Sequence, residues 1–259
     1  MLEADISLLK QAAYEAADIA KHHWRGSYQT WDKAEGAGPV TEADLAIDAQ
    51  LRTTLRRARP DYGWLSEETE DDAARLEAEE CFIIDPLDGT RSFIAGDSHW
   101  AHSLAIASHG DIRAAVVYLP IIDLMFCATK HGGAFCNDAP ISVATYATAD
   151  GAKIMGARPA FSPEHWKHGA VPDINKRFRP SLAYRMALIA QGRYDGMITF
   201  RDTWEWDIAA GSLLIQEAGG IASDRHGTPL TFNNRHPATK GVIAANATLH
   251  ADLRDRLVY

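Results

Sequence analysis

The segment from Phe82 to Phe93, FIIDPLDGTRSF, constrains the fold of this chain more than any other. A short apolar run, typical of a buried strand, ends in Asp85 and Asp88, and Gly89 and Thr90 follow at once. A turn of this kind can present backbone amides to an anion. Carboxylate oxygens suit Mg²⁺, whose coordination is commonly completed by phosphate. The segment therefore predicts a phosphate-handling metal site at the end of a buried strand.

Composition limits what that site can belong to. The 259 residues are 46% apolar, which suffices for one large domain or for two lobes sharing a cleft. The formal charge of −9 argues against a surface that binds nucleic acid backbone, so we expect no nucleic-acid polymer as partner. The odd number of cysteines, without metal-ligand spacing, predicts small buried thiols in a reducing compartment: Cys81, Cys127 and Cys136.

The sequence shows neither a secretion signal nor a membrane span. No basic segment followed by an apolar core stands at the N-terminus, and no stretch approaches about 18 apolar residues. We therefore expect a cytoplasmic protein with no membrane partner.

Hydrophobic periodicity predicts helices near the N-terminus and an antiparallel meander in the middle of the chain. One helix falls within residues 3–23, and a second, from Glu42 to Arg57, is capped by Thr41. The apolar positions of the second helix include Leu45, Leu51 and Leu55. The acidic run Glu70 to Glu80 is expected to be a solvated helix or loop. From Trp100 to Ser142, short β-rich runs alternate with turn signals and predict the meander.

After about Asp150, strands and helices alternate. The expected strands are KIMGA, YDGMITF and GVIAA, and the expected helices are Ser181 to Gln191, Glu205 to Ala218 and a last one from Thr248. We infer two layered α/β lobes, residues 1–148 and 149–259, of which the first is mainly antiparallel and carries most of the metal ligands.

Three further carboxylates could complete the metal site. Glu67 follows the strand-like YGWL, Asp207 lies in the first turn of a predicted helix, where the helix dipole favours it, and Asp44 lies in PVTEAD. Each also has a simpler interpretation: a surface acid, a favourable charge at a helix start, and a capping box with Thr41, respectively. The pair Asp85 and Asp88 is harder to explain in this way, because two like charges beside an apolar run repel unless something neutralises them.

Four motifs, PVTEAD, LSEE, DPLDGTRSF and WEWDIAAG, resemble in order and spacing the inositol monophosphatase family of Mg²⁺-dependent, lithium-sensitive phosphatases. A lone DxxDGT would be a weak signal, whereas four motifs in family order, covering nearly the whole chain, are specific. The resemblance implies an α/β fold of the five-layer αβαβα type, commonly a homodimer.

The resemblance also implies roles for individual residues. Two or three Mg²⁺ ions would be held by Glu67, Asp85, Asp88, Asp207 and the backbone carbonyl of Leu87. Thr90 and Asp44 would act with Glu67 on the attacking water, and the amides of Gly89 and Thr90 would face the phosphate. Asp207 and Lys33 are expected to contact substrate as well. Because Thr90 has no adjacent base, we expect no phosphoenzyme.

The identity of the small phosphate-ester substrate is less constrained. Arg91-Ser92 stands where true inositol monophosphatases typically have Thr-Asn, and this difference, with WEWDIAAG, favours the branch of 3'(2'),5'-bisphosphate nucleotidases. Inositol-1-monophosphatase and histidinol-phosphate phosphatase are the alternatives. Arg201, shortly before Asp207, is the cation most expected to set specificity by binding a second phosphate.

Two other classes of protein fit less well. Haloacid-dehalogenase-type phosphatases also use an aspartate-rich strand end, but their motif has one residue between the aspartates and stands early in the chain. A regulatory module that only binds a divalent metal would not need Thr90 beside Asp88 or a second lobe able to form a cleft.

Overall fold

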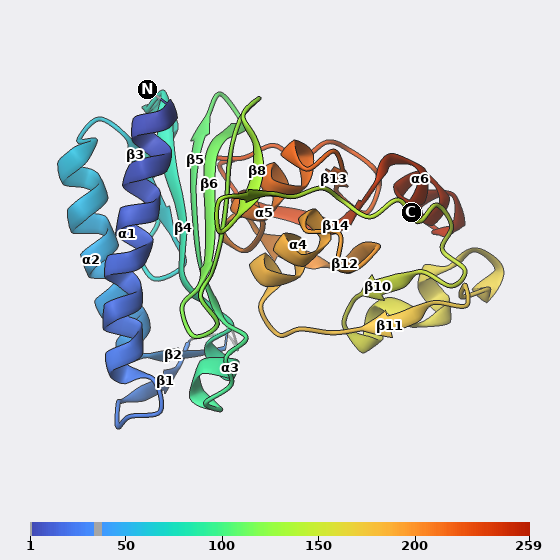
Figure 1. The fold of residues 1–259 in the computed structure, drawn as a ribbon, viewed down its shortest axis with the longest axis horizontal. Helices are drawn as coiled ribbons and strands as arrows, with labels where there is room; N and C mark the ends of the chain where they lie inside the picture. The colour runs from blue at the N-terminus through green and yellow to red at the C-terminus, as the bar shows by residue number, and fades with distance from the viewer. Residues whose placement is uncertain (1, 34–37) are drawn as a thin grey trace.

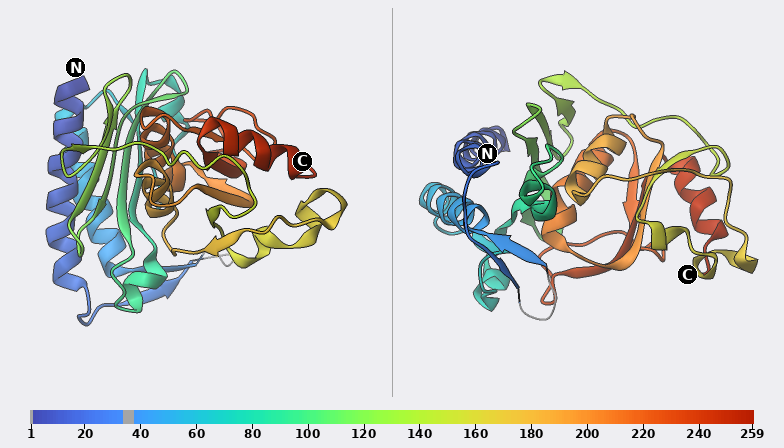
Figure 2. Two further views of the ribbon diagram at one scale, coloured as in Figure 1. Left: turned by 45° about the vertical axis from the view of Figure 1, so that its right-hand side comes forward. Right: turned by 90° about the horizontal axis from the view of Figure 1, so that it is seen from below.

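The computed structural model describes residues 2–33 and 38–259 and arranges them in five layers (Figure 1). A pair of long helices, a seven-stranded sheet, a second helix pair, a five-stranded sheet and an outer layer with one helix follow one another across the molecule. Figure 2 shows the same succession from two other sides. The α/β fold of the αβαβα type is therefore confirmed.

The first layer consists of two helices that cover one face of the large sheet. They are α1 (Leu2–His23) and α2 (Glu42–Ala58), joined through the antiparallel pair β1 (Thr30–Asp32) and β2 (Pro39–Thr41). Small side chains let α1 pack closely, because its buried residues include Ala12, Ala13, Ala16, Ala17 and Ala20.

Helix α2 begins as the sequence predicts, with Thr41 as its N-cap. Leu51 and Leu55 are fully buried, but Leu45 is 44% exposed, so the expectation for Leu45 is wrong. The reason is geometric, since the buried face runs through Ile47, Leu51 and Leu55, and a residue two positions before Ile47 lies about 200° around the helix from it.

The large sheet follows chain order from edge to edge. Its strands are β3 (Gly63–Ser66), β4 (Glu80–Asp88), β5 (Ala101–Ser108), β6 (Asp111–Leu119), β7 (Leu124–Thr129), β8 (Gly133–Cys136) and β9 (Ala139–Pro140). Strands β3 and β4 are parallel, and each later neighbouring pair is antiparallel, which confirms the meander. The acidic run before β4 contains a short 3₁₀ helix, η2 (Ala73–Glu77).

Residues 81–84 of β4 form an uninterrupted apolar run because helices cover both faces of the sheet. Phe82 and Ile84 pack in the hydrophobic cluster shared with α1 and α2, whereas Cys81 and Ile83 pack in the cluster on the opposite face. All three cysteines are free and buried, as predicted. The period of two that points alternate side chains to opposite faces thus places the end of β4 deep inside the molecule.

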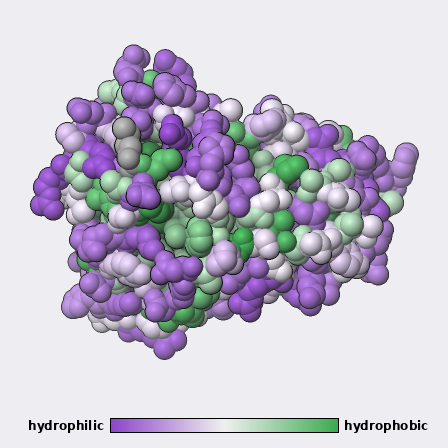
Figure 3. Space-filling model, turned by 45° about the horizontal axis from the view of Figure 1, so that its top comes forward, coloured by the Kyte–Doolittle hydropathy of each residue, from purple (hydrophilic) through white to green (hydrophobic). Residues whose placement is uncertain are grey.

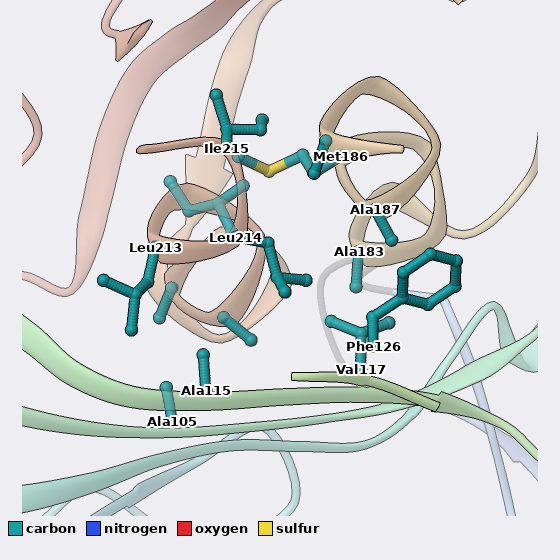
Figure 4. Packing of buried hydrophobic residues seen from close by; sticks show 14 of the residues in the cluster. Ala105, Ala115, Val117, Phe126, Ala183, Met186, Ala187, Leu213, Leu214 and Ile215 are labelled. Carbon is teal, nitrogen blue, oxygen red and sulfur yellow. The ribbon is translucent and has the colours of Figure 1, made fainter. Parts of the chain in front are cut away.

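The central helical layer lies between the two sheets. It consists of α4 (Leu182–Ala190) and α5 (Glu205–Glu217), and Figure 4 shows the two helices packed side by side on the large sheet. Every residue of α4 is buried. Helices with apolar residues on all sides are expected in such an internal layer.

The second sheet and the outer layer complete the fold. The strand order is β11 (Asn175–Arg177), β10 (Lys153–Met155), β12 (Gly196–Trp204), β14 (Ala238–Ala245) and β13 (Ile221–Ser223). Outside it lie α6 (Ala247–Arg256) and the short 3₁₀ helices η3 (Arg158–Phe161), η4 (Pro163–His165) and η5 (Lys167–Gly169). Strands β12 and β14 pair antiparallel, so alternation of strands and helices does not make this sheet all-parallel.

The boundary between lobes at residues 148 and 149 stays a prediction. One large hydrophobic cluster includes side chains from the first sheet, both central helices and the second sheet, so the proposed lobes share a core. Within the described residues, no helix combines the length and apolar character needed to cross a membrane. Figure 3 shows a surface on which hydrophilic side chains predominate and hydrophobic residues form small groups.

Candidate active site

Three aspartates from distant parts of the chain converge where β4 ends and α5 begins. Asp85 and Asp88 lie at the end of β4, and Asp207 lies in the first turn of α5. Each offers one carboxylate oxygen within 4.8 Å of the others. The structure therefore brings together three of the four carboxylates that the sequence analysis assigned to metal, although their role as ligands stays a prediction.

A bulge in β4 brings Asp85 and Asp88 to the same site. Asp85 pairs with Ser103 of β5 and Asp88 with Ala101, so Pro86 and Leu87 oppose a single residue on the neighbouring strand. The backbone amide of Leu87 donates a hydrogen bond to Oδ1 of Asp85, 3.0 Å away. This bend explains why two aspartates three residues apart can point into one site.

The electrostatics of the aspartate cluster favour a bound cation. Burial, together with the charges of the neighbouring carboxylates, raises the pKa of Asp85 and of Asp207 well above the ordinary value. Burial raises the pKa of Asp88 to about 6, although hydrogen bonds from Ser181 and Ala183 favour its charged form. In the described part of the chain, no lysine or arginine forms a salt bridge with Asp85 or Asp88. A donor set of crowded carboxylate oxygens, from the buried Asp85 and Asp88 and the half-buried Asp207, fits Mg²⁺.

Glu67 stands beside this cluster and is paired with Lys33. It follows β3, and its amide donates to the carbonyl of Ile84, which anchors it next to β4. The Lys33 ammonium lies 2.7 Å from Oε1 of Glu67 and 2.6 Å from Oε1 of Glu68. Burial would lower the pKa of Lys33, but the two carboxylates outweigh it and raise the pKa to about 12. Lys33 is thus placed at the site through Glu67, and its contact with substrate stays a prediction.

Asp44 and Thr90 are hydrogen-bonded to each other. The Thr90 hydroxyl lies 3.2 Å from Oδ1 of Asp44 and 3.3 Å from the carbonyl of Leu87. Oδ2 of Asp44 accepts hydrogen bonds from the amide and the hydroxyl of Thr41. The capping box and the contact with Thr90 therefore coexist, one on each oxygen of the same carboxylate. Burial raises the pKa of Asp44 to about 6, although the hydrogen bonds from Thr41 and Thr90 act to lower it.

Gly89 allows the chain to turn from β4 into the short helix α3 (Thr90–Ile94). Its φ of +101° is a conformation that residues with a side chain rarely adopt. A Cβ at this position would lie 3.3 Å from Cβ of Trp100 and 3.4 Å from Cβ of Ser181. The preference for glycine at position 89 thus has both a conformational and a steric cause.

Two arginines lie close to the carboxylates. A guanidinium nitrogen of Arg201, on β12, is 4.0 Å from Oδ2 of Asp207, and the Arg201 side chain is 68% exposed. Arg185, on α4, is buried and is held by hydrogen bonds to the carbonyls of Arg179 and Pro180. Burial lowers the pKa of Arg185 to about 10, although the charge of Asp88 partly opposes this shift.

Sequence reasoning missed Arg185, Ser181 and His102. Ser181 donates to Oδ2 of Asp88 at 2.6 Å, and the Ala183 amide donates to the same oxygen. His102 lies opposite the bulge, and burial lowers its pKa to about 4. None belongs to one of the four motifs, and only the packing of α4 and β5 against the end of β4 brings them to the site.

The fold and the site together define a class of protein. A five-layer αβαβα sandwich that gathers buried carboxylates at the ends of a strand and a helix is the architecture of a metal-dependent phosphoric monoester hydrolase. The chain belongs to the inositol monophosphatase family, whose model matches residues 1–258. Members of this family generally depend on Mg²⁺, and the acidic cluster fits that requirement.

Similarity to individual proteins extends along the chain. An inositol-1-monophosphatase of Rhizobium meliloti is 38% identical over 197 residues, which cover 73% of each chain. An inositol-1-monophosphatase of Mesorhizobium japonicum is 32% identical over 262 residues, 95% of each chain. The crystal structure of the extragenic suppressor protein suhB from Bartonella henselae matches with a TM-score of 0.84 and 30% identity over 97% of each chain. These matches confirm the family resemblance but do not single out the bisphosphate nucleotidase branch.

Proposed function

We propose that this phosphatase hydrolyses a small phosphate ester that carries a second phosphate, with 3'(2'),5'-bisphosphate nucleotides as the leading substrate. The observation that carries the proposal is the pair of guanidinium groups beside the aspartate cluster. Both Arg201 and Arg185 act on the charge of Asp207, since each lowers its pKa against the effect of burial. Guanidinium groups bind phosphate through paired hydrogen bonds, so the exposed Arg201 beside Asp207 suits a second phosphate next to the scissile one. The buried Arg185, whose guanidinium is held by backbone carbonyls, adds positive charge to the same site.

The metal ligands in this proposal are Glu67, Asp85, Asp88, Asp207 and the carbonyl of Leu87, which would hold two or three Mg²⁺ ions. Bound there, Mg²⁺ would supply an activated water and neutralise charge on the leaving oxygen. Thr90 and Asp44 form a hydrogen-bonded pair that would orient this water and take part in moving its proton. The amides of Gly89 and Thr90, at the start of α3, would face the phosphate.

The test compares bisphosphate and monophosphate substrates in the variant Arg201→Ala. Hydrogen bonds to charged groups contribute about 1.5–3 kcal/mol, so KM for the bisphosphate should rise by about 10-fold or more while KM for the monophosphate changes little. Arg57→Ala, which removes an exposed arginine from α2, is the matched control and should leave both constants unchanged. Equal losses on the two substrates would remove Arg201 from second-phosphate recognition.

Inositol 1-phosphate is the second candidate substrate. It is favoured by the two relatives named inositol-1-monophosphatase, which are 38% and 32% identical to the chain. A panel of inositol 1-phosphate, an adenosine bisphosphate, histidinol phosphate and a sugar bisphosphate, at fixed Mg²⁺ with and without lithium, would rank the candidates by kcat/KM. A higher kcat/KM for inositol 1-phosphate than for the bisphosphates would replace the first proposal with the second.

The homodimer and the cytoplasmic location expected from the sequence analysis belong to the same proposal. Sedimentation equilibrium of the purified protein tests the homodimer, since a monomer at micromolar concentration would contradict it. Fractionation of the native host tests the location.

A further inference from the structure

The bulge that brings Asp85 and Asp88 together has one residue opposite it, His102 of β5. Two residues of β4, Pro86 and Leu87, face this single residue, so the regular ladder of backbone hydrogen bonds is interrupted here. A proline also lacks the N–H that a ladder would use. The bulge therefore needs hydrogen bonds from outside the backbone ladder.

The side chain of His102 supplies one of these hydrogen bonds. Its Nδ1 lies 2.5 Å from the carbonyl oxygen of Pro86. Because a carbonyl can only accept, the proton of the neutral imidazole must be on Nδ1, and Nε2 then carries the lone pair. The imidazole is completely buried and stands edge-on to Trp100, with ring centroids 5.6 Å apart.

Packing alone does not account for a histidine at this position. Nε2 of His102 is buried and, among the described residues, has no hydrogen-bond partner. A buried polar atom without a partner costs about 1–3 kcal/mol, so an apolar side chain of similar size would be the more stable choice for a purely structural site. What the histidine offers and an apolar residue lacks is the Nδ1–H donor to Pro86.

The hydrogen bond from His102 acts on the segment that holds the predicted metal ligands. Pro86 lies between Asp85 and Leu87, and the Leu87 amide is fixed in turn by Oδ1 of Asp85. The next residue of β5, Ser103, donates to the carbonyl of Trp206 at 3.0 Å, directly before Asp207. Adjacent residues of β5 thus hold both sides of the aspartate cluster.

We propose that His102 is a positioning residue, which fixes the Pro86–Leu87 bulge and thereby sets the spacing of the Asp85 and Asp88 carboxylates and the direction of the Leu87 carbonyl. The inference rests on the proposed role of these groups as Mg²⁺ ligands. Residues that orient metal ligands typically change metal affinity by about 10–100-fold when they are replaced.

The experiment measures Mg²⁺ binding to the 259-residue protein by calorimetry, without substrate, in three variants. An asparagine places its amide nitrogen close to the position of Nδ1, whereas a glutamine reaches the position of Nε2. We expect His102→Asn to keep an affinity close to that of the unchanged protein, and His102→Gln and His102→Leu to lose about 10-fold or more. The control is His250→Leu, which replaces another buried histidine, on α6, whose Nε2 lies 2.7 Å from the Ser223 hydroxyl. It should lower the melting temperature without changing the Mg²⁺ affinity.

Three results would overturn the proposal. One is unchanged Mg²⁺ affinity in both His102→Gln and His102→Leu, and another is an asparagine variant as weak as the glutamine variant. If the leucine variant fails to fold, the asparagine and glutamine variants decide between the outcomes. The third needs no variant. Nitrogen NMR of the imidazole should show the proton on Nδ1, and a neutral imidazole protonated on Nε2 instead would rule out the hydrogen bond to Pro86. Absence of Mg²⁺ binding by the unchanged protein would instead overturn the proposed metal site itself, and with it this role of His102.

Discussion

At the scale of single residues, Asp88 is a carboxylate on which two opposing effects act. Its Oδ2 accepts hydrogen bonds from Ser181 and Ala183, which favour the charged form, while burial and Glu67 disfavour it. Oδ2 is therefore tied to the start of α4, and Oδ1 is left available to the proposed metal site. The same residue thus joins the architecture of α4 to the proposed metal site.

Replacing Asp88 by asparagine should separate these two functions. The amide keeps an oxygen that can accept from Ser181 or Ala183, but it removes a negative charge from the proposed metal site. Replacing a residue that only orients a metal ligand typically costs about 10–100-fold in activity. We expect the loss of turnover in Asp88→Asn to be larger than this. In the presence of a chelator, the melting temperature should stay equal or rise, because repulsion among carboxylates is relieved. Substantial activity in this variant, measured as phosphate release at saturating Mg²⁺, would show that Asp88 is not a ligand.

Thr90 offers a second prediction at this scale. Its hydroxyl is hydrogen-bonded to Asp44, and the proposed mechanism uses this pair to handle the proton of the attacking water. Thr90→Val keeps the shape but removes the hydroxyl, so kcat should fall by about 10²-fold or more with little change in KM. Thr90→Ser, which restores the hydroxyl, should recover most of the activity. A valine variant with near-normal kcat would exclude the hydroxyl from the reaction.

Residues of the site were predictable where they stand in a local pattern. Asp85 and Asp88 follow a strand-like run, and Asp207 starts an amphipathic stretch, so each could be placed at the end of an element. Arg185 could not be found in this way, because it lies inside an apolar helix and approaches Asp88 only through the packing of α4. Lys33 was found near the site, but its pairing with Glu67 depends on the fold of β1 and β2.

At the scale of elements, the contact between α4 and α5 depends on Gly211. A Cβ on this residue would lie 2.5 Å from Cβ and 2.8 Å from Sδ of Met186. Figure 4 shows the Met186 side chain directed toward α5, above the large sheet. Glycine is therefore required in α5 because the two helices approach closely. This packing fixes α5, which carries Asp207, relative to α4, whose N-cap Ser181 is hydrogen-bonded to Asp88.

Gly211→Ala should destabilise the protein by about 1–3 kcal/mol, the usual cost of overpacking a core. Met186→Ala should cost about 2–5 kcal/mol because it leaves a cavity. Combined, the two substitutions should cost less than the sum of the single costs, since the new methyl group occupies part of the vacated volume. Denaturant unfolding of the three variants with a chelator present measures these values. Strict additivity would mean that the two side chains do not meet.

Helices and strands were predictable where the spacing of their apolar residues followed a single helical or strand period. The helices α1, α2, α4 and α5 were placed within about two residues of their ends because their apolar faces and caps are local. The last helix begins at Ala247, one residue before the predicted Thr248, because Asn246 caps it. Which sheet each later strand joins was not predictable, since β12 pairs with β10 and with β14, strands distant in the chain.

At the scale of the whole molecule, the five layers bring like charges into a buried site. Without metal, Asp85, Asp88 and Asp207 each have a pKa above the ordinary value, because burial and their neighbours disfavour the charged forms. The metal-free fold therefore carries an electrostatic cost that a bound dication would remove. The fold is stable enough to bear this cost because large clusters of apolar side chains fill the spaces between the layers.

This cost gives the stability of the metal-free protein a defined dependence on pH. An aspartate whose pKa rises from 3.8 to about 6 on folding, as for Asp88, makes the folded state bind protons more tightly than the unfolded state between these values. The free energy of unfolding then falls as pH rises through this window, and Asp85 and Asp207 extend the fall to higher pH. Two buried histidines, His102 and His250, have the opposite effect, because folding lowers their pKa below the unfolded value of 6.5. Their contribution to the free energy of unfolding therefore increases as pH rises toward 6.5.

Comparing the protein with and without Mg²⁺ separates the two effects, because the histidines are not proposed ligands and contribute in both conditions. The rise in melting temperature caused by saturating Mg²⁺ should be small near pH 5 and grow steadily toward about pH 8. In Asp88→Asn, the same rise should be smaller and depend less on pH, since one titrating carboxylate is gone. Calorimetric melting curves over this pH range provide the measurement. If the rise in melting temperature is the same at every pH, protons and Mg²⁺ do not compete for these carboxylates. The converging aspartates would then not be the ligands of Mg²⁺.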